Sequence, residues 1–226
     1  MNKFFGALSN FFKPARPKFP SDSATEPAKI TQSKVLVIVY DPVMDQTTGT
    51  TLSQQQSWYR TSDLITSFML DMIQISGGMA RYQIVQRVDL DEFPAKTDGF
   101  RYTPQEYMNV LRGAVPPHMP QEVNYNAIIN QFNILQCVAR NEIDEVWTFG
   151  FPHAGFYESI MGGPGAFWCN APPLKNTEAS KRRFVIMGFS FERYVGEMLE
   201  AYGHRCLLYT SPSPRDRTRS RMPSSA

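Results

Sequence analysis

Cysteine and histidine are scarce in this sequence, whose 226 residues contain three of each. The cysteines, Cys137, Cys169 and Cys206, lie far apart and none belongs to a CxxC pair. This spacing excludes a disulfide framework as the basis of the fold. No two histidines have the short spacing of zinc ligands, so the pattern also argues against a zinc site.

A long apolar run and a basic domain are missing as well. No stretch approaches the roughly 20 apolar residues of a transmembrane helix, so the sequence predicts no membrane span. The formal net charge is +2, but residues 1–34 carry +4 and residues 207–226 carry +3, which leaves −5 on residues 35–206. Because the central part of the chain is acidic, we expect no nucleic-acid partner.

The two ends of the chain differ in composition from its middle. Residues 1–33 are rich in Pro, Ser, Lys and Ala and lack hydrophobic periodicity, which predicts a flexible leader. Its Phe-rich start, MNKFFGALSNFF, fits either a degenerate secretion signal or an irregular N-terminus. Residues 207–226 are poor in apolar residues, so we expect disorder there and a single domain over residues 34–206.

Apolar strands alternate with amphipathic helices across this domain. The sequence predicts strands at 35–40, 82–88, 145–149 and 184–187, and helices at 63–75, 104–112, 125–141 and 192–202. The strands are apolar throughout, which is typical of a parallel sheet covered by helices on each side. We therefore expect a three-layer α/β domain with a mainly parallel sheet, Rossmann-like or flavodoxin-like.

The longest connection of the domain follows the third predicted strand and carries two titratable residues, His153 and Glu158. Ligands of open α/β sheets bind at the carboxyl ends of the strands, where this connection begins. We predict that His153 and Glu158 act as acid and base, supported by Asp41 after the first strand and by Glu192 and Arg193 after the last. The alternative is that both residues only hydrogen-bond the backbone and stiffen the connection.

Polar and aromatic residues of the same connection predict a binding surface. Tyr157 and Trp168 offer apolar rings with a polar edge to a sugar or a peptide, and Asn170 offers hydrogen bonds. The alternative is that the aromatic residues pack the connection onto the domain. Cys169, Ser159 and Ser190 lie outside any GxSxG-type turn, so we expect an inert buried thiol and a helix-capping serine at position 190.

A metal site has one set of candidates. Asp41 and Asp45 follow the first strand, Asp89 and Asp91 follow the second, and their oxygens suit Mg²⁺ or Ca²⁺. Solvated loop acids give the same pattern, so the sequence does not decide whether a metal or any cofactor binds. The glycines at 162–165 lack the Lys-Ser/Thr of a phosphate-binding loop, and they favour a tight turn.

Two stretches of the domain resemble a known family. The residues EVWTFGFPHAGFYES…GGPGAFWCNAPP and RRFVIMGFSFERYVGEMLEAYGHR are similar to an uncharacterised family of bacterial and fungal α/β proteins that are often secreted. The resemblance implies secretion and brings no activity with it. The stretch LLYTSPSPRD…RSRMPSSA resembles translated sequencing-adapter sequence behind a truncated environmental reading frame, which implies that the domain is incomplete at its C-terminus.

These patterns leave two functions open, because an α/β fold hosts many chemistries. The first is a hydrolase that acts on an extracellular polymer or its fragments through acid and base residues at the strand ends. The second is a non-catalytic module that binds a carbohydrate or another ligand through its aromatic-rich loop. Both functions imply a small-molecule or polymer ligand.

Overall fold

The computed structural model describes residues 30–207 and has the α/β architecture that the sequence predicts. Its centre is a five-stranded sheet in the order β4-β1-β5-β7-β6. The strands are β1 (Thr31–Tyr40), β4 (Ala80–Leu90), β5 (Glu145–Gly150), β6 (Ser159–Gly162) and β7 (Phe184–Ser190). Neighbouring strands are parallel except β6, which pairs antiparallel with β7 at one edge.

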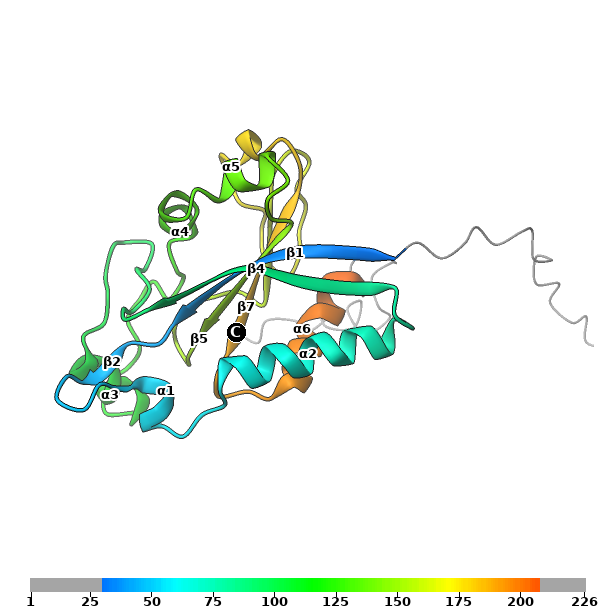
Figure 1. The fold of residues 1–226 in the computed structure, drawn as a ribbon. Coiled ribbons are helices and arrows are strands. Elements are labelled where there is room, and N and C mark those ends of the chain that lie inside the picture. The colour runs from blue at the N-terminus through cyan, green and yellow to red at the C-terminus, as the bar shows by residue number, and fades with distance from the viewer. Residues whose placement is uncertain (1–29, 208–226) are drawn as a thin grey trace, which may run out of the picture.

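Helices cover both faces of the sheet (Figure 1). On one face α2 (Thr61–Ile75) contacts α6 (Val195–Leu207), and on the other lie α4 (Tyr125–Gln131) and α5 (Ile134–Ala139). The shorter elements are α1 (Leu52–Gln55), α3 (Pro104–Leu111), the 3-10 turn η1 (Glu178–Ser180) and the paired strands β2 (Val43–Asp45) and β3 (Thr50–Thr51). The three predicted layers are therefore present.

The two central strands are almost entirely buried. Residues 35–40 of β1 and every residue of β5 are shielded from solvent. Because helices cover both faces, these strands show continuous apolar runs instead of alternation. Trp147 of β5 contacts Phe68 of α2 and Tyr82 of β4, with ring centroids 5.2 and 4.9 Å apart. These aromatic contacts join α2 to the sheet.

The predicted strands and the helix at 63–75 are confirmed, but three other predictions need correction. The helix expected at 125–141 is two helices, α4 and α5, because Asn133 between them adopts a left-handed φ of 50°. Asparagine tolerates this conformation better than most residues. β6 lies within the stretch predicted as loop, and it completes the sheet by pairing with β7.

The last helix also differs from its prediction. It begins at Val195 instead of residue 192 and continues through Gly203, where the sequence predicts its end, as far as Leu207. The rest of the predicted tail, residues 208–226, lies outside the described residues. Residues 1–29 of the predicted leader also lie outside them, and β1 already begins at Thr31. Within residues 30–207 no helix has the length and apolarity needed to cross a bilayer.

A reciprocal capping box opens α3. The hydroxyl of Thr103 accepts a hydrogen bond from the backbone N–H of Glu106 at 3.3 Å, and the Glu106 carboxylate accepts one from the N–H of Thr103 at 2.9 Å. The helix presents Tyr107, whose hydroxyl donates to the carbonyl of Pro152 at 2.9 Å. In this way α3 holds the connection that follows β5.

An ion pair between the buried Glu145 and the largely buried Arg205 fastens the end of α6 to the start of β5. The carboxylate of Glu145 accepts two hydrogen bonds from Arg205, at 2.8 and 3.0 Å, and a third from the Trp147 indole at 3.3 Å. Burial works against the charge of Arg205, but the charge and hydrogen bonds of Glu145, together with Tyr82 and Tyr202, outweigh it and raise the pKa of the guanidinium. The ion pair thus anchors the last turns of α6 on the sheet.

Replacing Glu145 tests this anchor. In Glu145→Gln the guanidinium of Arg205 stays largely buried without its counter-charge, so we expect the free energy of unfolding to fall by about 3 kcal/mol in urea denaturation. The control is Glu142→Gln, which breaks the pair of Arg140 and Glu142, whose side chains are 63% and 50% exposed. That change should cost less than about 1 kcal/mol. Equal effects of the two substitutions would refute the anchoring role.

Candidate functional site

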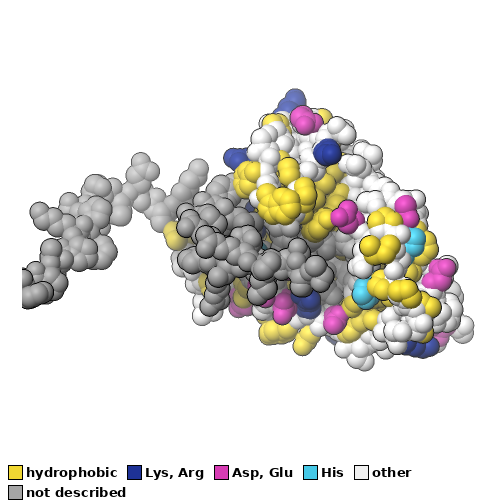
Figure 2. Space-filling model, turned by 180° about the vertical axis from the view of Figure 1, so that it is seen from behind, with side chains coloured by type: hydrophobic (Ala, Val, Ile, Leu, Met, Phe, Trp, Pro, Cys, Tyr) yellow, Lys and Arg dark blue, Asp and Glu magenta, His cyan; other side chains and the backbone are white. Residues whose placement is uncertain are grey.

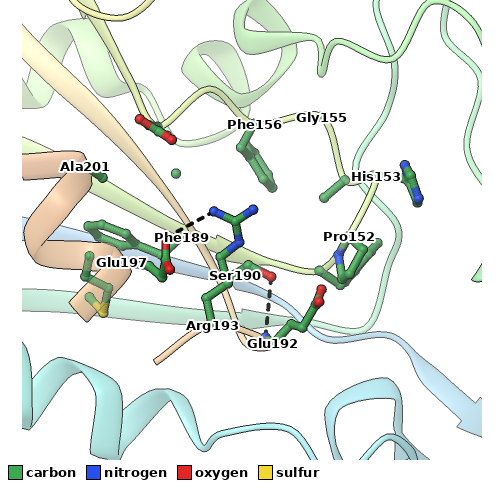
Figure 3. A pocket seen from close by; sticks show the side chains of 15 residues that line it. Pro152, His153, Gly155, Phe156, Phe189, Ser190, Glu192, Arg193, Glu197 and Ala201 are labelled. Carbon is green, nitrogen blue, oxygen red and sulfur yellow. Dashed lines mark hydrogen bonds and ion pairs between the residues drawn. The ribbon is translucent and has the colours of Figure 1, made fainter. Parts of the chain in front are cut away.

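A pocket of about 410 Å³ lies at the carboxyl ends of the adjacent strands β5 and β7. The loop after β5, the loop after β7 and the start of α6 form its walls (Figure 3). Its polar lining residues are His153, Glu158, Ser190, Glu192, Arg193 and Glu197. The structure therefore brings four of the five predicted catalytic residues to one pocket, and Asp41 lies outside its lining.

Two glycines let the loop after β5 lie against its surroundings. Gly188 is in β7, and a Cβ added there would overlap the carbonyl oxygen of Tyr157 and approach the Cβ of Phe156 to 2.6 Å. Gly155 has a φ of +95°, and a Cβ there would overlap the carbonyl oxygen of Gln121. Because neither glycine has a side chain, the loop can lie this close to β7 and to the segment around residue 121.

A buried lysine fixes the same loop. Lys96 is 1% exposed, and its ammonium group donates to the carbonyl oxygens of Gln121, His153 and Ala154 at 2.8, 2.6 and 2.8 Å. Desolvation lowers the pKa of Lys96 from 10.5 to about 8. All three donors of the ammonium are engaged by backbone, so Lys96 shapes the pocket without lining it.

Glu158 is a pocket carboxylate with two partners from other parts of the chain. Its Oε2 accepts a hydrogen bond from Nδ2 of Asn170 at 2.5 Å and lies 3.0 Å from Nδ1 of His204 in α6. The other ring nitrogen of His204 lies 3.8 Å from a carboxylate oxygen of Glu200, one turn earlier in the helix. Sequence reasoning missed His204, because Gly203 predicts the end of the helix. The sequence feature that could have identified His204 is its four-residue spacing from Glu200, which places both side chains on one face if the helix continues.

The second predicted catalytic residue, His153, is placed differently from Glu158. It is exposed, has a left-handed φ of 62°, and its carbonyl oxygen accepts from Lys96. Within the described part of the chain its ring has no hydrogen-bond partner. Figure 3 shows the ring at the side of the pocket away from Glu197 and Ala201. His153 thus lines the pocket as an unconstrained side chain, and it does not stiffen the loop through its ring.

The loop after β7 supplies an arginine to the lining. The guanidinium of Arg193 points between Phe189 and Phe156 in Figure 3 and forms an ion pair with Glu197 at 3.3 Å. Ser190, expected to cap the last helix, lies five residues before the helix begins, and its hydroxyl accepts from the N–H of Glu192 at 3.4 Å. Its role is therefore to shape the turn between β7 and α6.

The predicted ligand-binding residues are distributed around the pocket instead of within it. Tyr157 stacks on Tyr125 and donates its hydroxyl to Glu122, which fits the packing alternative. Trp168 is 56% exposed but is absent from the pocket lining. Asn170 acts through Glu158, as described above.

The predicted metal ligands, which include the predicted catalytic residue Asp41, form hydrogen bonds or ion pairs with other residues of the protein. Asp41 accepts hydrogen bonds from the N–H and the hydroxyl of Ser53 at 2.9 and 2.6 Å, at the start of α1. Asp45 holds a turn, Asp89 pairs with Arg87, and Asp91 accepts from the N–H of Val43. Within residues 30–207 no three side chains of His, Cys, Asp or Glu are grouped closely enough to hold a metal ion.

The sulfur and hydroxyl candidates are buried. Cys169 is 1% exposed, and the fully buried Ser159 donates its hydroxyl to the Cys169 carbonyl at 3.0 Å. Neither lines the pocket, so both are packing groups of the interior.

The surface is chemically mixed. Figure 2 shows one face on which Lys and Arg side chains are scattered between hydrophobic and acidic ones. The pocket has the same character, because carboxylates, a guanidinium and the rings of Phe151, Phe156 and Phe189 share its lining. Such a lining hydrogen-bonds hydroxyl groups and covers apolar ligand faces.

Comparisons of this chain with models of known protein families, with curated proteins and with solved structures find no match.

Gly188 offers a test of how the pocket is built. We expect Gly188→Ala to lower the free energy of unfolding by about 2–4 kcal/mol, because the new methyl group must displace the Tyr157 carbonyl or β7. Gly196→Ala is the control, since a Cβ there meets nothing within 4 Å in α6. The control should leave stability unchanged or raise it by up to about 1 kcal/mol. Urea denaturation distinguishes the two, and similar behaviour would contradict the close approach.

Lys96 offers a second test. Lys96→Met keeps the apolar stem but leaves three carbonyl oxygens without their donor, so we expect a loss of about 3 kcal/mol in the free energy of unfolding. The control is Lys175→Met at an exposed position, which should change stability by less than about 0.5 kcal/mol. Equal stability of the two variants would show that the buried ammonium does not hold the loop.

The difference in the free energy of unfolding between the wild type and Lys96→Met should also depend on pH. Because folding lowers the pKa of Lys96 from 10.5 to about 8, the unfolded chain binds more protons between these pH values. The penalty for burying the charge is fully present below pH 8 and is relieved as the pH rises toward 10.5. The free energy of unfolding of the wild type should therefore rise relative to Lys96→Met over this range. A difference that stays constant with pH would contradict the lowered pKa.

Proposed function

We propose that the pocket is the active site of a hydrolase that acts on an extracellular polymer or its fragments, with Glu158 as the principal acid/base group. The observation that carries this proposal is that two other side chains orient the carboxylate of Glu158. A carboxylate on a pocket wall is oriented by an amide from the following loop and by an imidazole from α6. Catalytic groups need such fixed orientation, because a misplaced acid or base loses most of its effect.

In the proposed reaction Glu158 accepts a proton from a water molecule while the water oxygen attacks the electrophilic carbon of the substrate. The bond from that carbon to the leaving group breaks, and the leaving group takes up a proton. His153 is the candidate donor, because it lines the same pocket and has no competing partner for its ring among the described residues. His204 and Asn170 are positioning residues, since they act through Glu158.

The lining of the pocket favours a ligand with many hydroxyl groups. Carboxylates and a guanidinium provide hydrogen bonds for hydroxyl groups, and the rings of Phe151, Phe156 and Phe189 provide apolar contact. Glu192 and Glu197 add negative charge that Arg193 only partly balances. A neutral, hydroxyl-rich ligand such as a sugar unit fits this balance better than an anionic one.

The test is Glu158→Gln in the full chain. We expect the wild type to release reducing ends from at least one of barley β-glucan, xylan and galactomannan, and the variant to lose at least about 100-fold in kcat with a similar KM. Glu178→Gln, in η1 and outside the pocket, is the control and should keep full activity.

The alternative function, a non-catalytic binding module, gives a different result. The wild type would then bind one of these polysaccharides without releasing reducing ends, and Glu158→Gln would bind it as well. Full turnover by Glu158→Gln would reject Glu158 as the acid/base group.

A further inference from the structure

A pair of exposed tyrosines lies outside the pocket. The rings of Tyr59 and Tyr194 come from different parts of the chain, yet their centroids are 5.5 Å apart with an interplanar angle of 54°. The two residues are 46% and 58% exposed. Most other aromatic contacts of the described chain involve buried rings, whereas this pair lies outside the hydrophobic core and forms an exposed aromatic surface.

The backbone joins the tyrosine pair to a segment of the pocket wall. The backbone N–H of Tyr59 donates to the carbonyl of Phe191 at 3.1 Å, which fastens the segment before α2 to the loop after β7. Glu192 and Arg193, the next residues of that loop, line the pocket, and Tyr194 follows them directly. One short loop therefore presents pocket residues and then an exposed ring.

We propose that Tyr59 and Tyr194 form a second sugar-binding subsite for a neutral polysaccharide whose adjoining segment of more than one sugar unit fills the pocket. This inference rests on the proposed function and narrows its polymer to a polysaccharide. The ring of a tyrosine covers the apolar face of a sugar, and its hydroxyl hydrogen-bonds at the edge. Both rings have few rotatable bonds, so ordering them on binding costs little entropy.

The charges near the pair favour a neutral chain. Glu192 and Arg193 are exposed beside Tyr194, Arg60 is exposed beside Tyr59, and Glu197 on the first turn of α6 pairs with Arg193, so charges of both signs surround the pair. Residues 35–206 carry a formal charge of −5 in total. The charges around the pair balance while the domain as a whole is acidic, so a polyanionic chain gains no attraction here, whereas a neutral polysaccharide meets hydrogen-bonding groups of both signs without repulsion.

The test separates binding of a long chain from turnover of a short one. The full chain and its Tyr59→Ala/Tyr194→Ala variant are compared by affinity electrophoresis in gels that contain barley β-glucan, xylan or galactomannan. We expect the variant to bind the retarding polysaccharide at least about tenfold more weakly. Its hydrolysis of a disaccharide or trisaccharide of the same sugar should stay within about twofold of wild type, because such a fragment fits the pocket alone.

The conservative control is Tyr59→Phe/Tyr194→Phe, which keeps both rings and should retain most of the affinity. Unchanged polysaccharide affinity of the alanine variant, with turnover still abolished by Glu158→Gln, would overturn the subsite and leave the proposed function standing. A wild type that neither binds nor cleaves any of the three polysaccharides would overturn both. Loss of self-association in the alanine variant, with unchanged polysaccharide affinity, would identify the pair as a contact between copies of the chain and overturn the subsite.

Discussion

The pocket depends on a positive charge that is buried without a carboxylate partner. The ammonium group of Lys96 gives up its hydration and gains hydrogen bonds to three carbonyl oxygens, two of which belong to the loop after β5. Residues 153 and 154 lie in no strand or helix that could pair these carbonyl oxygens, so without Lys96 they would lose their hydrogen-bond donor. The lysine thus offsets the cost of one desolvated charge by satisfying loop backbone that could not otherwise be buried.

Two glycines also contribute to the position of the loop, because they have no side chain. A loop with polar backbone can lie flat against a sheet only where no Cβ intervenes, and Gly188 in β7 and Gly155 in the loop itself meet that requirement. Tyr107 adds a hydrogen bond to Pro152 from α3. The loop is therefore held from the sheet, from α3 and from the segment around residue 96. This explains how a connection with little regular structure can present Glu158 at a defined position.

The sequence predicts the sheet and the edge where the pocket lies better than it predicts the contacts within the pocket. Continuous apolar runs identify β1, β5 and β7 because both faces of these strands are covered, and parallel strands bring their carboxyl ends to one edge. Lys96 could not be recognised, because no local pattern marks a lysine that distant segments enclose. His204 was missed because glycine disfavours a helix interior, and here the ion pair of Arg205 with Glu145 outweighs that preference at Gly203.

The two carboxylate oxygens of Glu158 have different surroundings. One oxygen is engaged by Asn170 and His204, which approach it from separate segments of the chain. The other accepts no hydrogen bond from the described residues, so it keeps its lone pairs for a ligand hydroxyl or a water molecule. A residue that only stiffened the loop would gain most by using both oxygens on the protein. The arrangement of Glu158 therefore leaves one carboxylate oxygen accessible at the pocket, to water or to a ligand.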